Sequence, residues 1–171
     1  SDKMLSDTLA EVHLPVSVMK LILGSKSSIV SSSPLIYGTT ITGAVYRFLV
    51  LNEKEWRLLR LLQDLCIRDP VICPFIPKRK RRKPIEAESL NLASRMHIDG
   101  DILGRLAERD ASYLEYTVTR TDFDHPLSPS KESSAATRER FAEASQGLLG
   151  NSSNQAEEVM RWLRRLLHVG F

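Results

Sequence analysis

A leucine-rich segment at residues 52–66 most constrains what this chain can fold into. Its apolar side chains recur at the i, i+3, i+4 spacing of one helix face, and they are Trp56, Leu58, Leu59, Leu61, Leu62 and Leu65. Asn52 begins the segment and Glu55 follows three residues later, which is an Asn-led capping box. The pattern predicts a helix packed into a core, and the side chains assigned to that core are Trp56, Leu58, Leu62 and Leu65.

The chain before this helix has the composition of β-structure. Short apolar runs at 9–14 and 16–23 predict two strands, and the Ser-rich stretch at 25–33 predicts a loop. Two further runs, 35–41 and 44–51, flank the turn dipeptide Thr-Gly and predict an antiparallel hairpin.

Four such strands form a small sheet, which is marginally stable alone and exposes its edges. Two arrangements would stabilise such a sheet. The sheet continues with strands absent from this sequence, or helices cover it in a self-contained α+β domain. We expect the first arrangement.

The chain after the helix reads as further helices and loops. Pro70, Pro74 and Pro77 end the leucine-rich helix, and 85–96 carries a weaker helical pattern. Asp99 or Asp101 is expected to cap the next helix, with Gly100 permitting the sharp entry.

Three features are predicted beyond that helix. The loop region 121–153 is expected to be flexible, with a short helix at 135–146 ended by Gly147. A last helix follows Asn154, because Asn154 and Glu157 repeat the capping pattern ahead of an apolar stripe, and the chain end after it reads as a true C-terminus.

A basic run stands in the proline-flanked loop 77–84, and its members are Lys78, Arg79, Lys80, Arg81, Arg82 and Lys83. Six adjacent cations repel one another and must stay solvated. Three interpretations remain open: a nuclear-import signal, a contact with a polyanion, or a solvated insertion. No aromatic residue interleaves with the run, which argues against a base-stacking surface.

Residues with catalytic or metal-binding chemistry are scattered. The four histidines lack metal-ligand spacing among themselves and with the two cysteines, Cys66 and Cys73. His97 near Asp99 and Asp101 is the one group that resembles acid–base apparatus, and a helix cap explains it more simply. We therefore predict a non-catalytic protein that needs no cofactor. No apolar run is long enough to span a membrane, and the start of the sequence reads as an internal cut rather than a signal peptide.

Several short motifs occur in the order that a known family shows. They are Leu-Ala-Glu-Val-His-Leu at 9–14, Leu-Ile-Tyr-Gly-Thr-Thr at 35–40 with Thr-Gly at 42–43, Glu-Trp-x-x-Leu-x-x-Leu-Gln at 55–63, and Ile-Asp-Gly-Asp-Ile-Leu at 98–103. In this order the chain resembles the C-terminal end of the triple-β-propeller scaffold family. That family includes the large subunit of the UV-damaged-DNA-binding complex, the cleavage-and-polyadenylation specificity factor A subunit and a splicing-factor subunit.

The resemblance implies an α+β fold in which 1–51 supply the terminal strands of a β-propeller blade and 52–171 form a C-terminal helical domain. Asp99, Gly100 and Asp101 are then a structural signature. The implied function is a nuclear, non-catalytic scaffold that links substrate receptors to a cullin-RING ubiquitin ligase in DNA repair and chromatin regulation.

The implied partners are cullin-RING ligase components, WD-type substrate receptors and the remaining propeller domains of the same polypeptide, with nucleic acid contacted through the complex and no membrane. The alternative is a scaffold subunit of a pre-mRNA 3′-end processing or splicing complex. The basic run and the stretch 119–153 lengthen the chain relative to the family pattern.

Overall fold

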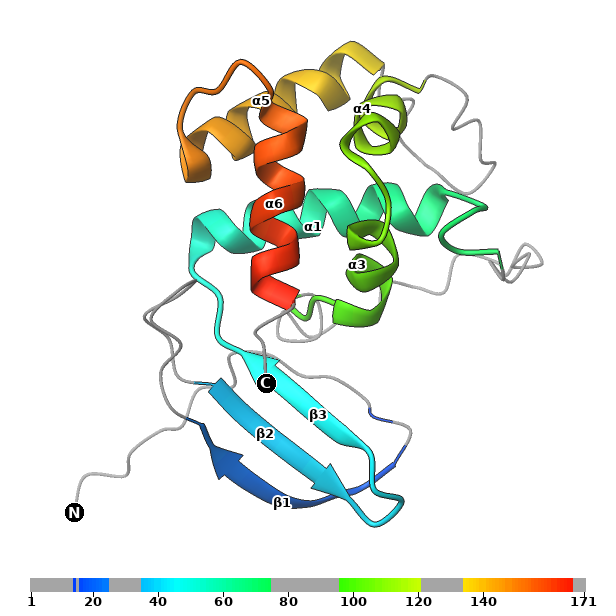
Figure 1. Ribbon diagram of the computed structural model, residues 1–171, viewed down its shortest axis with the longest axis vertical. Helices are drawn as coiled ribbons and strands as arrows, with labels where there is room; N and C mark the ends of the chain where they lie inside the picture. The colour runs from blue at the N-terminus through cyan, green and yellow to red at the C-terminus, as the bar shows by residue number, and fades with distance from the viewer. Residues whose placement is uncertain (1–13, 15, 25–34, 75–95, 121–133, 168–171) are drawn as a thin grey trace, which may run out of the picture.

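The computed structural model describes residues 14, 16–24, 35–74, 96–120 and 134–167. In these ranges the chain forms a three-stranded antiparallel sheet and five helices, so the fold belongs to the mixed α+β class. Figure 1 shows the sheet at one end of the molecule and the helices gathered at the other.

The sheet has the strand order β1 (Val18–Leu23), β2 (Leu35–Thr40) and β3 (Val45–Leu49). The predicted hairpin is confirmed as β2 and β3, although both strands are shorter than expected because Ile41 and Ala44 belong to the turn. Gly43 closes that turn with a φ of 82°, a conformation that favours glycine. The strand expected at 9–14 lies outside the described residues except for Leu14, which is in no strand.

The predicted leucine-rich helix is confirmed as α1 (Glu53–Arg68). Both bonds of the capping box form: the Glu55 amide donates to Asn52 Oδ1, and the Asn52 amide donates to Glu55 Oε2, each over 2.9 Å. The helix runs past residue 66 to Arg68, and Asp69 is its C-cap in an extended conformation, as expected for the residue before Pro70. Leu58, Leu62 and Leu65 are buried, as expected.

The second half of the chain forms α3 (Gly100–Ala107), α4 (Ala111–Thr119), α5 (Ser134–Leu149) and α6 (Gln155–Leu167). The prediction that a helix ends at Gly147 is wrong, because α5 continues through Gly147 and stops before Gly150, whose φ is 82°. The helix predicted at 135–146 is confirmed as part of α5, so the region 121–153 is not one continuous loop. Residues 75–95 and 121–133 lie outside the described residues, and with them all but the last residue of the helix expected at 85–96.

One core joins the helices. α1 packs against α3 and α5, and α6 packs against α3, α4 and α5. The largest apolar side chains that are fully buried in this core are Leu58, Leu59, Leu62, Ile72, Leu103, Leu106, Leu114, Val159, Met160 and Leu163. Amphipathic helices bury their apolar stripes against one another, so this helical domain has a complete interior of its own.

The sheet stands apart from that core. Within the described residues no helix lies along either face of the sheet; the helices stand on its β3 side, and β1 is the strand farthest from them (Figure 1). Leu49 and Leu51, at the chain's exit from the sheet, pack against the helical core. The second of the two expected arrangements, a sheet covered by helices, is therefore not what the described residues form.

Arginine side chains bind the carboxyl ends of two helices. Arg47 of β3 donates from Nη2 to the carbonyl oxygens of Leu166 and Leu167, at 2.9 and 2.7 Å. Arg164 of α6 donates to the carbonyl oxygens of Ala107 and Arg109, at 2.9 and 2.6 Å. The last carbonyls of a helix lack partners in the helix and carry its partial negative charge, so a guanidinium is well suited to both positions.

Candidate interaction surface

The Ile-Asp-Gly-Asp signature forms the N-terminus of α3, which is bonded to side chains of α1. Asp99 Oδ1 accepts hydrogen bonds from the amides of Asp101 and Ile102, at 2.9 and 3.4 Å, so Asp99 is the cap of α3. Gly100 is the first helical residue, and Asp101 is an exposed residue of the first turn. Of the two caps considered from the sequence, Asp99 is therefore the correct one.

Two side chains of α1 hold this segment in place. Gln63 Oε1 accepts a hydrogen bond from the Asp99 amide over 2.6 Å, and Trp56 Nε1 donates to the Met96 carbonyl over 3.0 Å. Trp56 is only partly buried, so its assignment to the core is wrong. An indole needs a partner for its N–H, and the Met96 carbonyl supplies one near the surface.

In the acid–base arrangement considered for His97, Asp99 is a cap: its Oδ1 accepts hydrogen bonds from two backbone amides of α3. Among the described residues, no group of three or more His, Cys, Asp or Glu side chains is placed to hold a metal ion. The geometry of this segment is that of a helix cap.

A buried carboxylate lies where α1 ends. Asp69 is fully buried; its Oδ1 accepts from the amides of Val71 and Ile72, at 2.7 and 3.4 Å, and its Oδ2 accepts from the Tyr113 hydroxyl at 2.8 Å. Burial, reinforced by this bond to Asp69, raises the pKa of Tyr113 to about 12. Three donors satisfy the carboxylate, so it ties the end of α1 to α4.

Cys66 lies close to this site and is fully buried. Burial, with smaller contributions from Cys73 and Asp69, raises the pKa of the Cys66 thiol to about 12. A thiol with this pKa stays protonated near neutral pH and is a poor nucleophile. The interpretation of Cys66 as a small core residue is confirmed.

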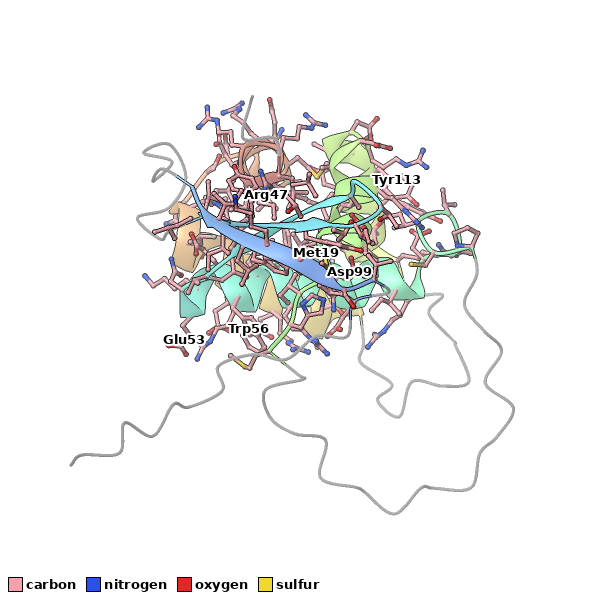
Figure 2. The ribbon with its side chains drawn as sticks, turned by 90° about the horizontal axis from the view of Figure 1, so that it is seen from below. Met19, Arg47, Glu53, Trp56, Asp99 and Tyr113 are labelled. Atoms are coloured by element: carbon pink, nitrogen blue, oxygen red, sulfur yellow. The ribbon has the colours of Figure 1, made fainter. Side chains whose placement is uncertain are left out.

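Exposed apolar side chains gather on the sheet, at the end of the molecule opposite the helical core. In β1 the exposed fractions are 66% for Met19, 65% for Leu21, 44% for Ile22 and 71% for Leu23. β1 is the strand nearest the viewer in Figure 2, where Met19 is labelled. Large exposed apolar patches mark interaction sites, which makes this strand the strongest candidate for one.

No pattern in the sequence indicated which strand would be exposed. The run at 16–23 is apolar at nearly every position, a pattern typical of a strand that is covered on both faces. In the structure β1 is exposed although its composition is that of a covered strand. This mismatch can be recognised only once the structure is known.

The basic run, Lys78, Arg79, Lys80, Arg81, Arg82 and Lys83, lies outside the described residues, so the choice among its three interpretations stays open.

Comparisons of the chain with protein-family models, with curated proteins and with solved structures find no match. None of the helices in the described ranges is long and apolar enough to cross a membrane.

Proposed function

We propose that this chain is the C-terminal region of a non-catalytic protein-interaction scaffold of the damage-binding type. In this proposal residues 1–51 complete the last blade of a β-propeller, and 52–171 form the helical domain that follows it. The whole protein links substrate receptors to a cullin-RING ubiquitin ligase in the nucleus, and the basic run acts as its import signal.

The contrast between the sheet and the helices carries the proposal. The helical domain buries its leucines in a complete core, whereas β1 exposes Leu21 and Leu23 at 65% and 71%. A sheet needs a second layer against its apolar face. In a β-propeller each four-stranded blade is flanked by neighbouring blades, which would supply that layer to a three-stranded remnant.

The chemistry of the polar groups agrees with a role in binding rather than catalysis. The carboxylates of Asp69 and Asp99 are engaged in hydrogen bonds within the fold, and the Cys66 thiol has a pKa raised to about 12. The Asp69 carboxylate joins α1 to α4, and the Asp99 carboxylate caps α3. A scaffold requires such rigidity, because it presents surfaces in fixed positions.

Affinity purification of the full-length polypeptide from nuclear extract tests this proposal. We expect cullin-RING ligase components and WD-type receptors among the proteins retained at stoichiometric amounts. Retention of polyadenylation or splicing factors instead would favour the RNA-processing alternative. Retention of neither group would overturn the proposed function.

A matched variant tests the basic run. Changing Lys78, Arg79, Arg81 and Arg82 to Ala removes four charges and should move the full-length protein to the cytoplasm if the run is an import signal. If the run binds a polyanion, the variant stays nuclear and its salt-sensitive retention on nucleic acid falls. A variant that changes neither property leaves the solvated insertion as the interpretation.

A further inference from the structure

Two arginines and two tyrosines form a continuous row along one side of α4. The row consists of Arg109, Tyr113, Tyr116 and Arg120, whose spacing of four, three and four residues places them on one helix face. The guanidinium carbon of Arg109 lies 5.6 Å from the centre of the Tyr113 ring. Arg120 stands in the same relation to Tyr116, also at 5.6 Å, and the two ring centres are 6.4 Å apart. Each cation therefore lies over an aromatic ring within cation–π distance, and the rings join the two pairs.

This Arg–Tyr row is accessible from the solvent. Tyr116 is 53% exposed, and Arg109 is exposed as well. Tyr113 and Arg120 are partly buried, and the Tyr113 hydroxyl is fixed by its bond to Asp69. α4 lies at the end of the helical domain away from the sheet, so the row is separate from the exposed leucines of β1 (Figure 1). The row is therefore both exposed and held in position by the fold.

The charges around the row nearly cancel. Arg164 of α6 donates to the Arg109 carbonyl over 2.6 Å, which brings another guanidinium to the start of the row. Three carboxylates adjoin the row in sequence, those of Glu108, Asp110 and Glu115. Asp110 accepts from a backbone amide of α4, and Glu115 lies about 100° around the helix from the next residue of the row. The field of the row is thus local, and a partner that binds here has to use the rings as well as the cations.

We propose that the Arg–Tyr row binds a single strand of nucleic acid directly. A base stacks on Tyr116, and the guanidinium groups of Arg109 and Arg120 bind phosphates on either side of it. These two arginines are eleven residues apart, about 16 Å along a helix, which matches about five nucleotides of a stacked strand. The inference goes beyond the proposed function, in which nucleic acid is contacted through the complex.

The aromatic rings favour a single strand over the other anionic partners. The face of an aromatic ring is electronegative, so the carboxylates of an acidic protein segment gain nothing from Tyr116, whereas a base stacks on it. In a duplex the bases are already stacked on one another and do not reach the ring. The row also has the feature that the basic run at 78–83 lacks, because aromatic side chains stand between its cations.

Binding of labelled strands to the full-length protein tests the inference. The probes are fluorescein-labelled oligothymidylate and oligouridylate about 12 nucleotides long, and fluorescence anisotropy gives their Kd. We expect Tyr116→Ala to weaken binding by at least about fivefold, because a stacked base is lost. Tyr116→Phe keeps the ring and should stay within about twofold of the unaltered protein. Equal affinities for the two variants would overturn the inference.

Glu115→Ala is the matched control on the same helix. It removes a negative charge beside the row and should bind the strands at least as tightly as the unaltered protein. A loss of affinity as large as that of Tyr116→Ala would show that any change in α4 weakens binding, and the inference would fail. Far-ultraviolet circular dichroism checks that each variant is folded.

The phosphate contacts have a test that does not depend on the rings. For a single strand, each neutralised phosphate adds about 0.7 to the slope of log affinity against log salt. Changing Arg109→Gln and Arg120→Gln together should therefore lower that slope by about 1.4. An unchanged slope would overturn the inference, even if Tyr116→Ala proves unable to fold.

Further probes separate the possible partners. A preference between oligothymidylate and oligouridylate identifies the strand as DNA or RNA, and either supports the inference. A duplex of the same length that binds as tightly, or labelled polyglutamate that loses as much affinity with Tyr116→Ala, would overturn it. Binding that the four-alanine variant of the basic run abolishes and Tyr116→Ala leaves unchanged would assign the strand to the basic run instead. Absence of binding by every probe would overturn the inference as well.

Discussion

The helical domain and the sheet treat the same residue type in opposite ways. Leu58, Leu62 and Leu163 are fully buried between helices, whereas Leu21 and Leu23 of β1 are 65% and 71% exposed. The helices supply one another's second layer, and the described sheet has none. Whether a leucine is buried here therefore depends on whether a second element among the described residues packs against it, and not on the residue type.

The largest expected effect is in the helical core. Leu58→Ala should lower the free energy of unfolding by about 2–5 kcal/mol, because it leaves a cavity where no side chain is exposed. Ile41→Ala, at the tip of the β2–β3 turn where Ile41 is 82% exposed, should change it by less than about 0.5 kcal/mol. Urea unfolding followed by circular dichroism measures both. Equal losses would contradict the contrast between the two regions.

A smaller effect is expected where α1 meets α4. Tyr113→Phe removes the hydroxyl that donates to buried Asp69 Oδ2 and should cost about 1.5–3 kcal/mol, the range for hydrogen bonds to charged groups. Tyr116→Phe is the matched control on the same helix, since Tyr116 is 53% exposed. Chemical unfolding of the two variants side by side decides the matter. A Tyr113→Phe protein as stable as the control would show that the buried bond adds no stability.

The cap of α3 gives a third, smaller difference. Asp99→Ala leaves the Asp101 and Ile102 amides without their acceptor and should cost about 0.5–2 kcal/mol. Asp101→Ala keeps that cap and should cost less than about 0.5 kcal/mol. Thermal unfolding of both variants measures the difference. A larger loss for Asp101→Ala would mean that the signature acts through its second aspartate.

The smallest effect is a pH dependence at the start of α4. The Asp110 carboxylate accepts a hydrogen bond from the Tyr113 amide over 2.8 Å, and this bond lowers the pKa of Asp110 below its ordinary value. The stabilisation is therefore present above the ordinary pKa of about 3.9 and is lost as the pH falls through the lower pKa of the folded state. A titration of the Asp110 carboxyl carbon by NMR measures that pKa. Asp110→Asn, which caps without titrating, should remove the dependence.

Local sequence patterns predicted much of the fold. The leucine stripe, the capping box at Asn52 and Glu55, and the Thr-Gly turn each specify structure through neighbours in sequence, so α1 and the β2–β3 hairpin were predicted almost to the residue. The glycine at position 147 was predicted to end a helix, but α5 continues through it. A Cβ atom there would have no neighbour within 4 Å, so the position does not require glycine. Gly150 ends the helix instead.

Contacts between distant residues were out of reach of the sequence. Trp56 belongs to the apolar stripe by spacing, but its indole N–H bonds to Met96, 40 residues away. The bond from Tyr113 to Asp69 spans 44 residues, and neither residue signals the other. The exposed leucines of β1 are a third case, because an apolar run does not reveal which of its side chains the other described residues leave uncovered.

The two bonds from Arg47 to the end of α6 set an order of events during synthesis. Leu166 follows Arg47 by 119 residues, so at the usual 5–20 residues per second the ribosome adds it about 6–24 s later. Throughout that interval the nascent sheet has no anchor on α6. The sheet can therefore be fixed to the helical domain through Arg47 only after the end of α6 has been made, late in synthesis.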